Sequence, residues 1–222
     1  MITHRAPALL GLILAIVLMP LSMAEARSGE ALVNAVRDGQ MARVSILLDL
    51  GVSPDSATSD GEFQGKTALM WASESGRMDM IEALLDYGAE VDRRNPKGGT
   101  ALMYASVSGN VDAIERLVEA GADPNHTVSN GWSPLMLATA KGHESSVRRL
   151  VELGADKNAQ DVYGWTVLMR AAEQGNEEMV RTLLQVGVDP ETMDDTGNTA
   201  RKIAESVGNR QIVRILEAWP RG

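Results

Sequence analysis

The strongest constraint on the fold is a period of 33 residues that runs through most of the 222-residue chain. Four separate positions keep this spacing, three of them glycine and one threonine or serine. One glycine series and the hydroxyl series two residues after it are Gly65, Gly98, Gly131, Gly164 and Gly197, and Thr67, Thr100, Ser133, Thr166 and Thr199. Such a period indicates supersecondary units that stack and bury their apolar faces against one another.

Within each unit the spacing predicts two short helices. The threonine or serine stands where its side-chain oxygen caps a helix of about eight residues, as in 67–75, and Gly76 ends that helix because glycine tolerates a left-handed conformation. The second helix has apolar pairs at helical spacing, as in Met80, Ile81, Leu84 and Leu85.

These units resemble the ankyrin repeat family. The family pattern D-x-x-G-x-T-P-L-H-x-A…G-H…L-L…G-A-D is matched at 130–138, at Gly142-His143, and at 150–156. The resemblance covers about residues 28–219 and implies an all-α repeat solenoid of about six repeats, each with a helix-turn-helix and a β-hairpin finger. The approximate repeat ranges are 28–60, 61–94, 95–127, 128–160, 161–193 and 194–222.

Both ends of the array have the features of capping repeats. The first unit starts directly in a helix, with Ser28 as its N-cap, and in the last unit Arg201 and Lys202 replace an apolar Leu-Met pair. Trp219 either folds back over that end or frays.

The first finger has four extra residues between Ser53 and Gln64, which we interpret as a flexible, tolerated insertion in preference to a functional tip.

The N-terminal segment 1–26 is predicted to be a signal peptide, which leaves 27–222 as the ankyrin repeat domain. A short positive segment precedes an apolar run over 6–19, and small residues then form a cleavage site. We expect cleavage after Ala26, with Ala24 as the competing site. A retained membrane anchor is the alternative, but the apolar run is shorter than the ~20 residues that span a bilayer.

Composition excludes several kinds of chemistry. The chain has no cysteine, which excludes disulfides, zinc-thiolate sites and thiol nucleophiles, and 30 acidic against 21 basic residues argue against nucleic-acid binding. Beyond the leader the histidines are His126 and His143, with no third ligand near them in the pattern, and no catalytic motif is found. We therefore expect no enzyme activity, no cofactor and no metal.

Four methionines stand where the family usually has histidine: Met70, Met103, Met136 and Met169. We interpret them as apolar filler between stacked helices. The alternative is a thioether ladder for a soft metal or for oxidants.

The resemblance also implies where a partner binds, because ankyrin repeats generally use the concave groove formed by finger tips and first-helix faces. The chain has eight aromatic residues, and most fall on this side. The candidate partner-binding residues are Phe63, Lys66, Trp71, Tyr104, Trp132, Tyr163, Trp165 and Arg170. Exposed aromatic residues are common interface anchors, although finger aromatics that pack against neighbouring fingers would give the same pattern.

The sequence thus predicts a non-enzymatic, monomeric protein-protein interaction module in the bacterial periplasm, with an unidentified protein partner and no membrane contact after cleavage of the signal peptide. The alternatives are a secreted effector that acts on a host protein and a retained, membrane-anchored scaffold.

Overall fold

The computed structural model describes residues 28–59 and 61–220, so the predicted signal peptide and its cleavage site lie outside the described residues. Within these ranges, twelve α-helices follow one another as six pairs. The pairs are α2 (Gly29–Arg37) with α3 (Met41–Asp49), α4 (Ala68–Glu74) with α5 (Met78–Asp86), α6 (Ala101–Ser108) with α7 (Val111–Glu119), α8 (Pro134–Lys141) with α9 (Glu144–Glu152), α10 (Val167–Gln174) with α11 (Glu177–Gln185), and α12 (Ala200–Ser206) with α13 (Arg210–Ala218).

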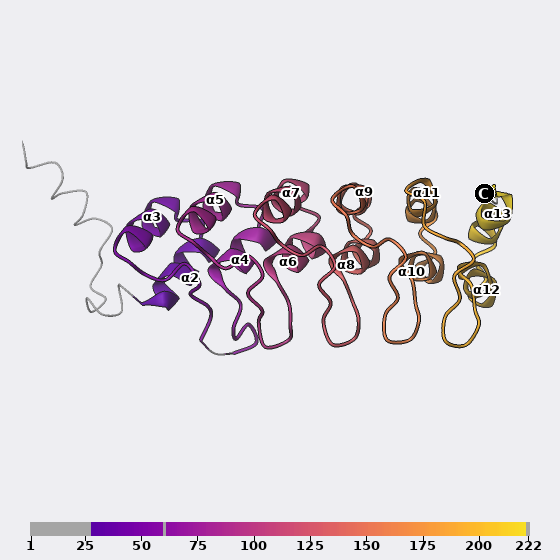
Figure 1. The fold of residues 1–222 in the computed structure, drawn as a ribbon, viewed down its shortest axis with the longest axis horizontal. Helices are drawn as coiled ribbons and strands as arrows, with labels where there is room; N and C mark the ends of the chain where they lie inside the picture. The colour runs from indigo at the N-terminus through magenta and orange to yellow at the C-terminus, as the bar shows by residue number, and fades with distance from the viewer. Residues whose placement is uncertain (1–27, 60, 221–222) are drawn as a thin grey trace, which may run out of the picture.

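The helices form two parallel rows along an elongated molecule (Figure 1). The first helices of the pairs (α2, α4, α6, α8, α10 and α12) make the inner row, and the second helices (α3, α5, α7, α9, α11 and α13) make the outer row. Long loops, here called fingers, project beyond the inner row, on the side away from the outer helices. Each helix packs mainly against its partner and against the equivalent helix of the next pair. The expected all-α repeat solenoid is confirmed.

Every inner helix begins with the predicted hydroxyl cap. The six N-cap residues accept a hydrogen bond from the backbone N–H three residues later, and they are Ser28, Thr67, Thr100, Ser133, Thr166 and Thr199. Each cap satisfies a backbone donor that has no partner inside the helix, an effect that contributes about 1 kcal/mol. Glycines at the left-handed C-cap end three of these helices, as at Gly109, where φ is 75°.

The four methionines fill the core, as the sequence predicted. Met70, Met103, Met136 and Met169 are at most 3% exposed. Two of them also have a role that the pattern did not reveal. The sulfur atoms of Met70 and Met169 accept the N–H of Thr67 and Thr166 at 3.4 Å, so each thioether completes a reciprocal capping arrangement.

The fourth helix pair, α8 with α9, differs from its neighbours in how its buried hydroxyls are bonded. The hydroxyls of Thr139 on α8 and Ser146 on α9 are buried, and neither has a hydrogen-bond partner within the part of the chain that the structure describes. Ser73 and Ser106 occupy the position of Thr139 in the two preceding pairs. Each of their hydroxyls donates to the carbonyl four residues before, at 2.7 Å. A buried hydroxyl without a partner costs about 1–3 kcal/mol, so these two groups lower the stability of this pair.

The fingers lack the paired strands of the expected β-hairpins in the residues that the structure describes. The structure assigns no strand in residues 28–59 and 61–220, and a single isolated bridge pairs Ala57 with Thr67. Four fingers instead close as five-residue turns, in which the first residue's N–H donates to the fifth residue's carbonyl, as from Asp161 to Trp165 at 3.0 Å. Such short turns leave too few paired residues for a ladder.

The C-terminal pair ends the array as expected. Arg201 and Lys202 are both exposed, where inner repeats have buried residues. Trp219 packs partly against the core at the end of α13. None of the helices in the described ranges is both long enough and apolar enough to cross a membrane.

Candidate partner-binding surface

The finger side of the inner row carries two clusters of cations and aromatic rings, which together contain seven of the eight candidate residues. The first, here called the Lys66 cluster, consists of Phe63, Lys66, Trp71, Glu74 and Tyr104. The second, here called the Arg170 cluster, consists of Trp132, Asp161, Trp165 and Arg170. The eighth candidate, Tyr163, belongs to neither cluster and is 66% exposed.

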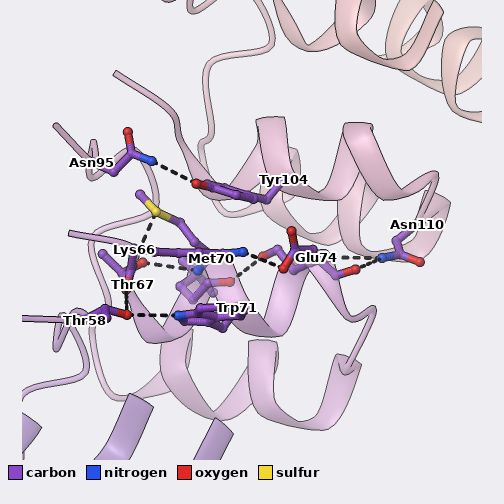
Figure 2. Close-up of polar contacts among 11 residues, drawn as sticks. Thr58, Lys66, Thr67, Met70, Trp71, Glu74, Asn95, Tyr104 and Asn110 are labelled. Atoms are coloured by element: carbon purple, nitrogen blue, oxygen red, sulfur yellow. Dashed lines mark hydrogen bonds and ion pairs between the residues drawn. The ribbon is translucent and has the colours of Figure 1, made fainter. Parts of the chain in front are cut away.

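In the Lys66 cluster, a buried ammonium lies between two aromatic rings (Figure 2). The Nζ atom of Lys66 is 3.7 Å from the ring centre of Trp71 and 4.2 Å from that of Tyr104. It also donates to Glu74 Oε2 at 2.5 Å. Because Lys66 is only 1% exposed, it supports this surface from beneath, and a partner does not reach it without a rearrangement.

Burial of Lys66 removes its ammonium group from water, which disfavours the charged form, and Glu74 opposes this effect. Burial lowers the pKa of Lys66, while the hydrogen bond and the charge of Glu74 act in the opposite direction. Burial also raises the pKa of the Tyr104 hydroxyl, which accepts a hydrogen bond from Asn95 Nδ2 at 2.9 Å. A desolvated cation against an aromatic ring gains about 2 kcal/mol, so the two rings offset part of the cost of burial.

The insertion in the first finger is part of this cluster. Thr58 Oγ1 accepts the indole N–H of Trp71 at 3.2 Å, and the ring of Phe63 packs edge-on against Trp71 with ring centres 5.2 Å apart. The sequence analysis interpreted this segment as a flexible insertion. The described part of the loop is instead folded onto α4 because it supplies a hydrogen-bond acceptor and a ring to the same tryptophan.

The Arg170 cluster inverts this arrangement. The guanidinium carbon of Arg170 lies 4.4 Å from the ring centre of Trp165 and 5.2 Å from that of Trp132. Its Nη2 donates to Asp161 Oδ2 at 2.7 Å. Here the carboxylate is the buried partner, with 1% of its side chain exposed against 21% for the arginine.

Asp161 also fixes the backbone of its own finger. Its Oδ1 accepts the backbone N–H groups of Tyr163 and Trp165 at 2.9 and 3.0 Å. Burial alone would raise the pKa of Asp161, but the hydrogen bonds from Arg170, Tyr163 and Trp165 outweigh it and hold this pKa below the usual value. One carboxylate therefore couples the finger to α10.

The neighbouring fingers are stacked closely in this half of the molecule. The N–H of Val162 donates to Asn130 O at 3.2 Å, and the N–H of Asp195 donates to Tyr163 O at 3.4 Å. At Gly164, where φ is +75°, a Cβ atom would lie 2.6 Å from the backbone nitrogen of Asp195. This contact requires glycine and fixes the finger tip that carries Val162 and Tyr163.

A family model described as ankyrin repeats (3 copies) matches residues 14–95, 32–128, 92–161 and 160–218, which together span most of the chain. The chain belongs to the ankyrin repeat family. Ankyrin repeats are generally protein-protein interaction modules and typically lack enzyme activity. No curated protein matches the chain.

In two of the repeats a finger residue bonds to an inner-helix residue nine positions later. The pair is Asn95 with Tyr104 in one repeat and Asp161 with Arg170 two repeats later. Asn95, like Asp161, accepts two backbone N–H groups of its finger, those of Lys97 and Gly99. In these two repeats a neutral finger acceptor lies beside a neutral helix residue and a charged one beside a charged residue, whereas the equivalent Asp194 of the last repeat bonds within its own finger.

The sequence analysis missed Asp161 as a member of the site. Asp161 carried a recognisable signal, because it occupies the first position of the D-x-x-G pattern. Glu74 ends the first helix of its own repeat, a position that predicts this surface, and it lies there beside Lys66. Both histidines contact segments far from them in the sequence, and His143 links neighbouring repeats: the Nε2 atoms of His126 and His143 lie 2.8 and 2.9 Å from the carbonyl oxygens of Gly98 and Val107. No group of three or more potential metal ligands occurs in the part of the chain that the structure describes.

Proposed function

We propose that this ankyrin repeat protein is a non-enzymatic module that binds a protein partner through its concave finger-and-helix surface after export to the periplasm. The observation that carries the proposal is the finger tip at 162–163. Val162 is 54% exposed and Tyr163 is 66% exposed, although the backbone between them is held by Asp161 and by both neighbouring fingers.

A rigid tip favours binding over a role in packing. An exposed tyrosine offers a large contact area with few rotatable bonds, and a fixed backbone lowers the entropy that is lost on association. Phe63 repeats this arrangement at the other end of the surface: it is 48% exposed while one edge is held against Trp71. The remaining candidates, Trp71, Tyr104, Trp132, Trp165 and Arg170, are half-buried and form the floor between these two anchors.

A shallow hollow of about 250 Å³ beside the Lys66 cluster extends this surface. Phe63, Glu74, Pro96, Lys97 and Tyr104 contribute to its walls. It presents both signs of charge next to aromatic rings, as a protein interface does, and it does not favour a partner of one charge.

Site-specific photo-crosslinking tests the proposal. A photoreactive phenylalanine at position 163 is expected to crosslink a partner in an extract of the source cells, and the same group in place of Tyr87 on the outer row is the control. Excess wild-type protein should compete, whereas the Val162→Ser/Tyr163→Ala double variant should not. Equal crosslinking from both positions, or competition by the folded double variant, would show that the finger tip is not the binding site.

Export is tested separately. N-terminal sequencing of the protein from fractionated cells is expected to find a periplasmic chain that begins at residue 27, or at residue 25 for the competing cleavage site. A chain with its leader intact in the membrane fraction would instead indicate an anchored scaffold, and a processed chain in the culture medium would indicate a secreted effector.

A further inference from the structure

The outer row of helices changes its charge at one repeated position. The fifth residue of each outer helix from α5 onward follows the 33-residue period, and the five residues are Glu82, Glu115, Arg148, Arg181 and Arg214. The three arginines lie on consecutive helices, α9, α11 and α13. Because adjacent helices pack about 8–10 Å apart, these side chains form a regular basic row in a protein whose formal net charge is −9.

Two of these side chains bond to the same position on the next outer helix. Glu115 on α7 pairs with Arg149 on α9 at 2.5 Å. One repeat later, Arg148 on α9 donates to Thr182 Oγ1 at 3.1 Å and to Gln185 Oε1 at 2.6 Å, both on α11. The guanidinium of Arg148 is thus used within the protein.

The last junction lacks these acceptors. Ile215 and Ala218 on α13 stand 33 residues after Thr182 and Gln185, so Arg181 meets two apolar residues where Arg148 meets two oxygen atoms. Within residues 28–59 and 61–220, no hydrogen bond or ion pair holds the guanidinium of Arg181 or of Arg214. Ten N–H donors in two guanidinium groups are therefore available to an external acceptor.

An open hollow of about 320 Å³ occupies this junction. Its lining contains both arginines and no acidic residue: Arg181, Gln211, Arg214, Ile215, Ala218 and Trp219. Glu217, three residues after Arg214, is directed to Arg201 instead, at 3.7 Å. The site combines two free guanidinium groups with an apolar floor and one aromatic wall.

We propose that the groove between α11 and α13 binds an acidic, extended segment of a partner protein, with carboxylates on Arg181 and Arg214 and an apolar side chain against Ile215, Ala218 and Trp219. Guanidinium groups bind carboxylates through paired, charge-assisted hydrogen bonds. In a polyproline-type segment, residues three apart lie on one face about 9 Å apart, which matches the separation of neighbouring outer helices. A nucleic acid fits less well, because the strongly acidic protein repels a long polyanion while two arginines attract it.

This groove lies on the outer row, on the side of the molecule away from the fingers (Figure 1). A partner on the finger surface therefore leaves it open. The protein then has two binding surfaces for two different segments, and it acts as an adaptor between them.

Fluorescence anisotropy at low salt tests the groove directly. The probe is a labelled twelve-residue peptide with aspartate at every third position and leucine between them, and the control peptide has asparagine in place of aspartate. We expect the wild-type protein to bind the first peptide and not the second. Reversing the charge of one arginine alone, by Arg181→Glu or by Arg214→Glu, should weaken binding by about tenfold. The double variant Arg181→Glu/Arg214→Glu should abolish it. The matched control, Arg93→Glu/Arg94→Glu, makes the same change in charge away from the groove and should bind normally.

A second variant tests the geometry without changing the charge. Ala218→Gln gives Arg181 the acceptor that Arg148 has in Gln185, at an exposed position, and is expected to weaken peptide binding several-fold. Equal binding of both peptides, unchanged binding by Ala218→Gln and by the double reversal, or a preference for a DNA oligonucleotide over the peptide would overturn the proposal. A dimer seen by sedimentation without peptide, and lost in the double reversal, would overturn it in favour of a second copy as the occupant.

Discussion

The Lys66 and Arg170 clusters both place a cation against aromatic rings and a carboxylate, but they differ in which residues supply these groups and in which charge is buried. Lys66 occupies the position just before the helix cap, which Trp132 and Trp165 occupy in later repeats, whereas Arg170 occupies the helical position of Trp71 and Tyr104. The cation and the rings have therefore exchanged places on the same backbone. In the first cluster the cation is buried and the carboxylate is partly exposed, and in the second the carboxylate is buried.

The exchange shows that the repeated backbone keeps the contact between a cation and aromatic rings in the same place, although different positions supply the cation. A lysine ammonium is a point charge that two rings can enclose, whereas the planar guanidinium of Arg170 stacks on rings and still donates to Asp161. Removal of one residue from each pair should therefore have different effects in the two halves.

The largest effect is expected for Asp161→Ala. This change leaves two finger N–H groups without their acceptor and leaves Arg170 with only the more distant Glu173, at 3.7 Å, and it should lower the free energy of unfolding by about 2–3 kcal/mol. Urea denaturation measures this loss. Asp195→Ala, at an exposed position in the next finger, is the control and should change the stability by less than about 0.5 kcal/mol. A loss of similar size in both variants would show that Asp161 does not couple the finger to α10.

The next effect compares finger stacking in the two halves. Gly164→Ala should cost about 2 kcal/mol, because its Cβ would lie 2.6 Å from the Asp195 nitrogen in addition to the strain of a positive φ. Gly98→Ala has a similar φ of +82° but only an ordinary contact of 3.5 Å with Val128, so it should cost about 1 kcal/mol. Thermal melting of both variants measures the difference, and equal costs would mean that the C-terminal fingers are not the more tightly stacked.

In the Lys66 cluster, loss of the carboxylate should cost more than loss of the cation. Glu74→Gln leaves a buried ammonium without a counter-charge and should destabilise the protein by about 1–2 kcal/mol, a value reduced because Glu74 is partly exposed. Lys66→Met keeps the volume between the rings and should stay within about 1 kcal/mol of the wild type. Chemical denaturation of both variants gives the order, and the reverse order would show that the cation–ring contacts dominate.

The smallest effect concerns acid. The pKa of Asp161 is lower in the folded protein than in the unfolded chain, so its stabilising effect is complete above its usual pKa near 4 and is lost as the pH falls through the lowered value. Asp161→Asn should therefore lose less stability than the wild type between about pH 5 and pH 2. Lys66→Met, which leaves Asp161 in place, should follow the wild-type slope. Parallel wild-type and Asp161→Asn curves would contradict this assignment.

The repeat period predicted most of the fold. The hydroxyl caps, the glycines that end the helices and the buried methionines all follow from local rules that act within one unit. The β-hairpin fingers are not confirmed as paired strands, because residues such as Asp161 satisfy finger N–H groups that a strand ladder would otherwise pair.

The candidate surface was predicted only in outline. Seven of its residues do gather in clusters, but the burial of Lys66 depends on Tyr104 in the next repeat and on Phe63 in the insertion. The exposure of Tyr163 depends on finger stacking. The contact with Tyr104 and the finger contacts join different units, and Phe63 belongs to the irregular first finger, so a pattern within one regular unit does not predict them.

Thr139 and Ser146, whose hydroxyls have no hydrogen-bond partner among the described residues, lie in the fourth of six helix pairs, whose finger also carries Trp132 of the Arg170 cluster. Because each pair is supported only by its neighbours, a solenoid of this kind divides at its least stable junction, and its cooperative unit is then shorter than the chain. We therefore expect the segments on either side of α8 and α9 to unfold in separate steps. Binding at the fingers, which spans that junction, would restore a single cooperative transition.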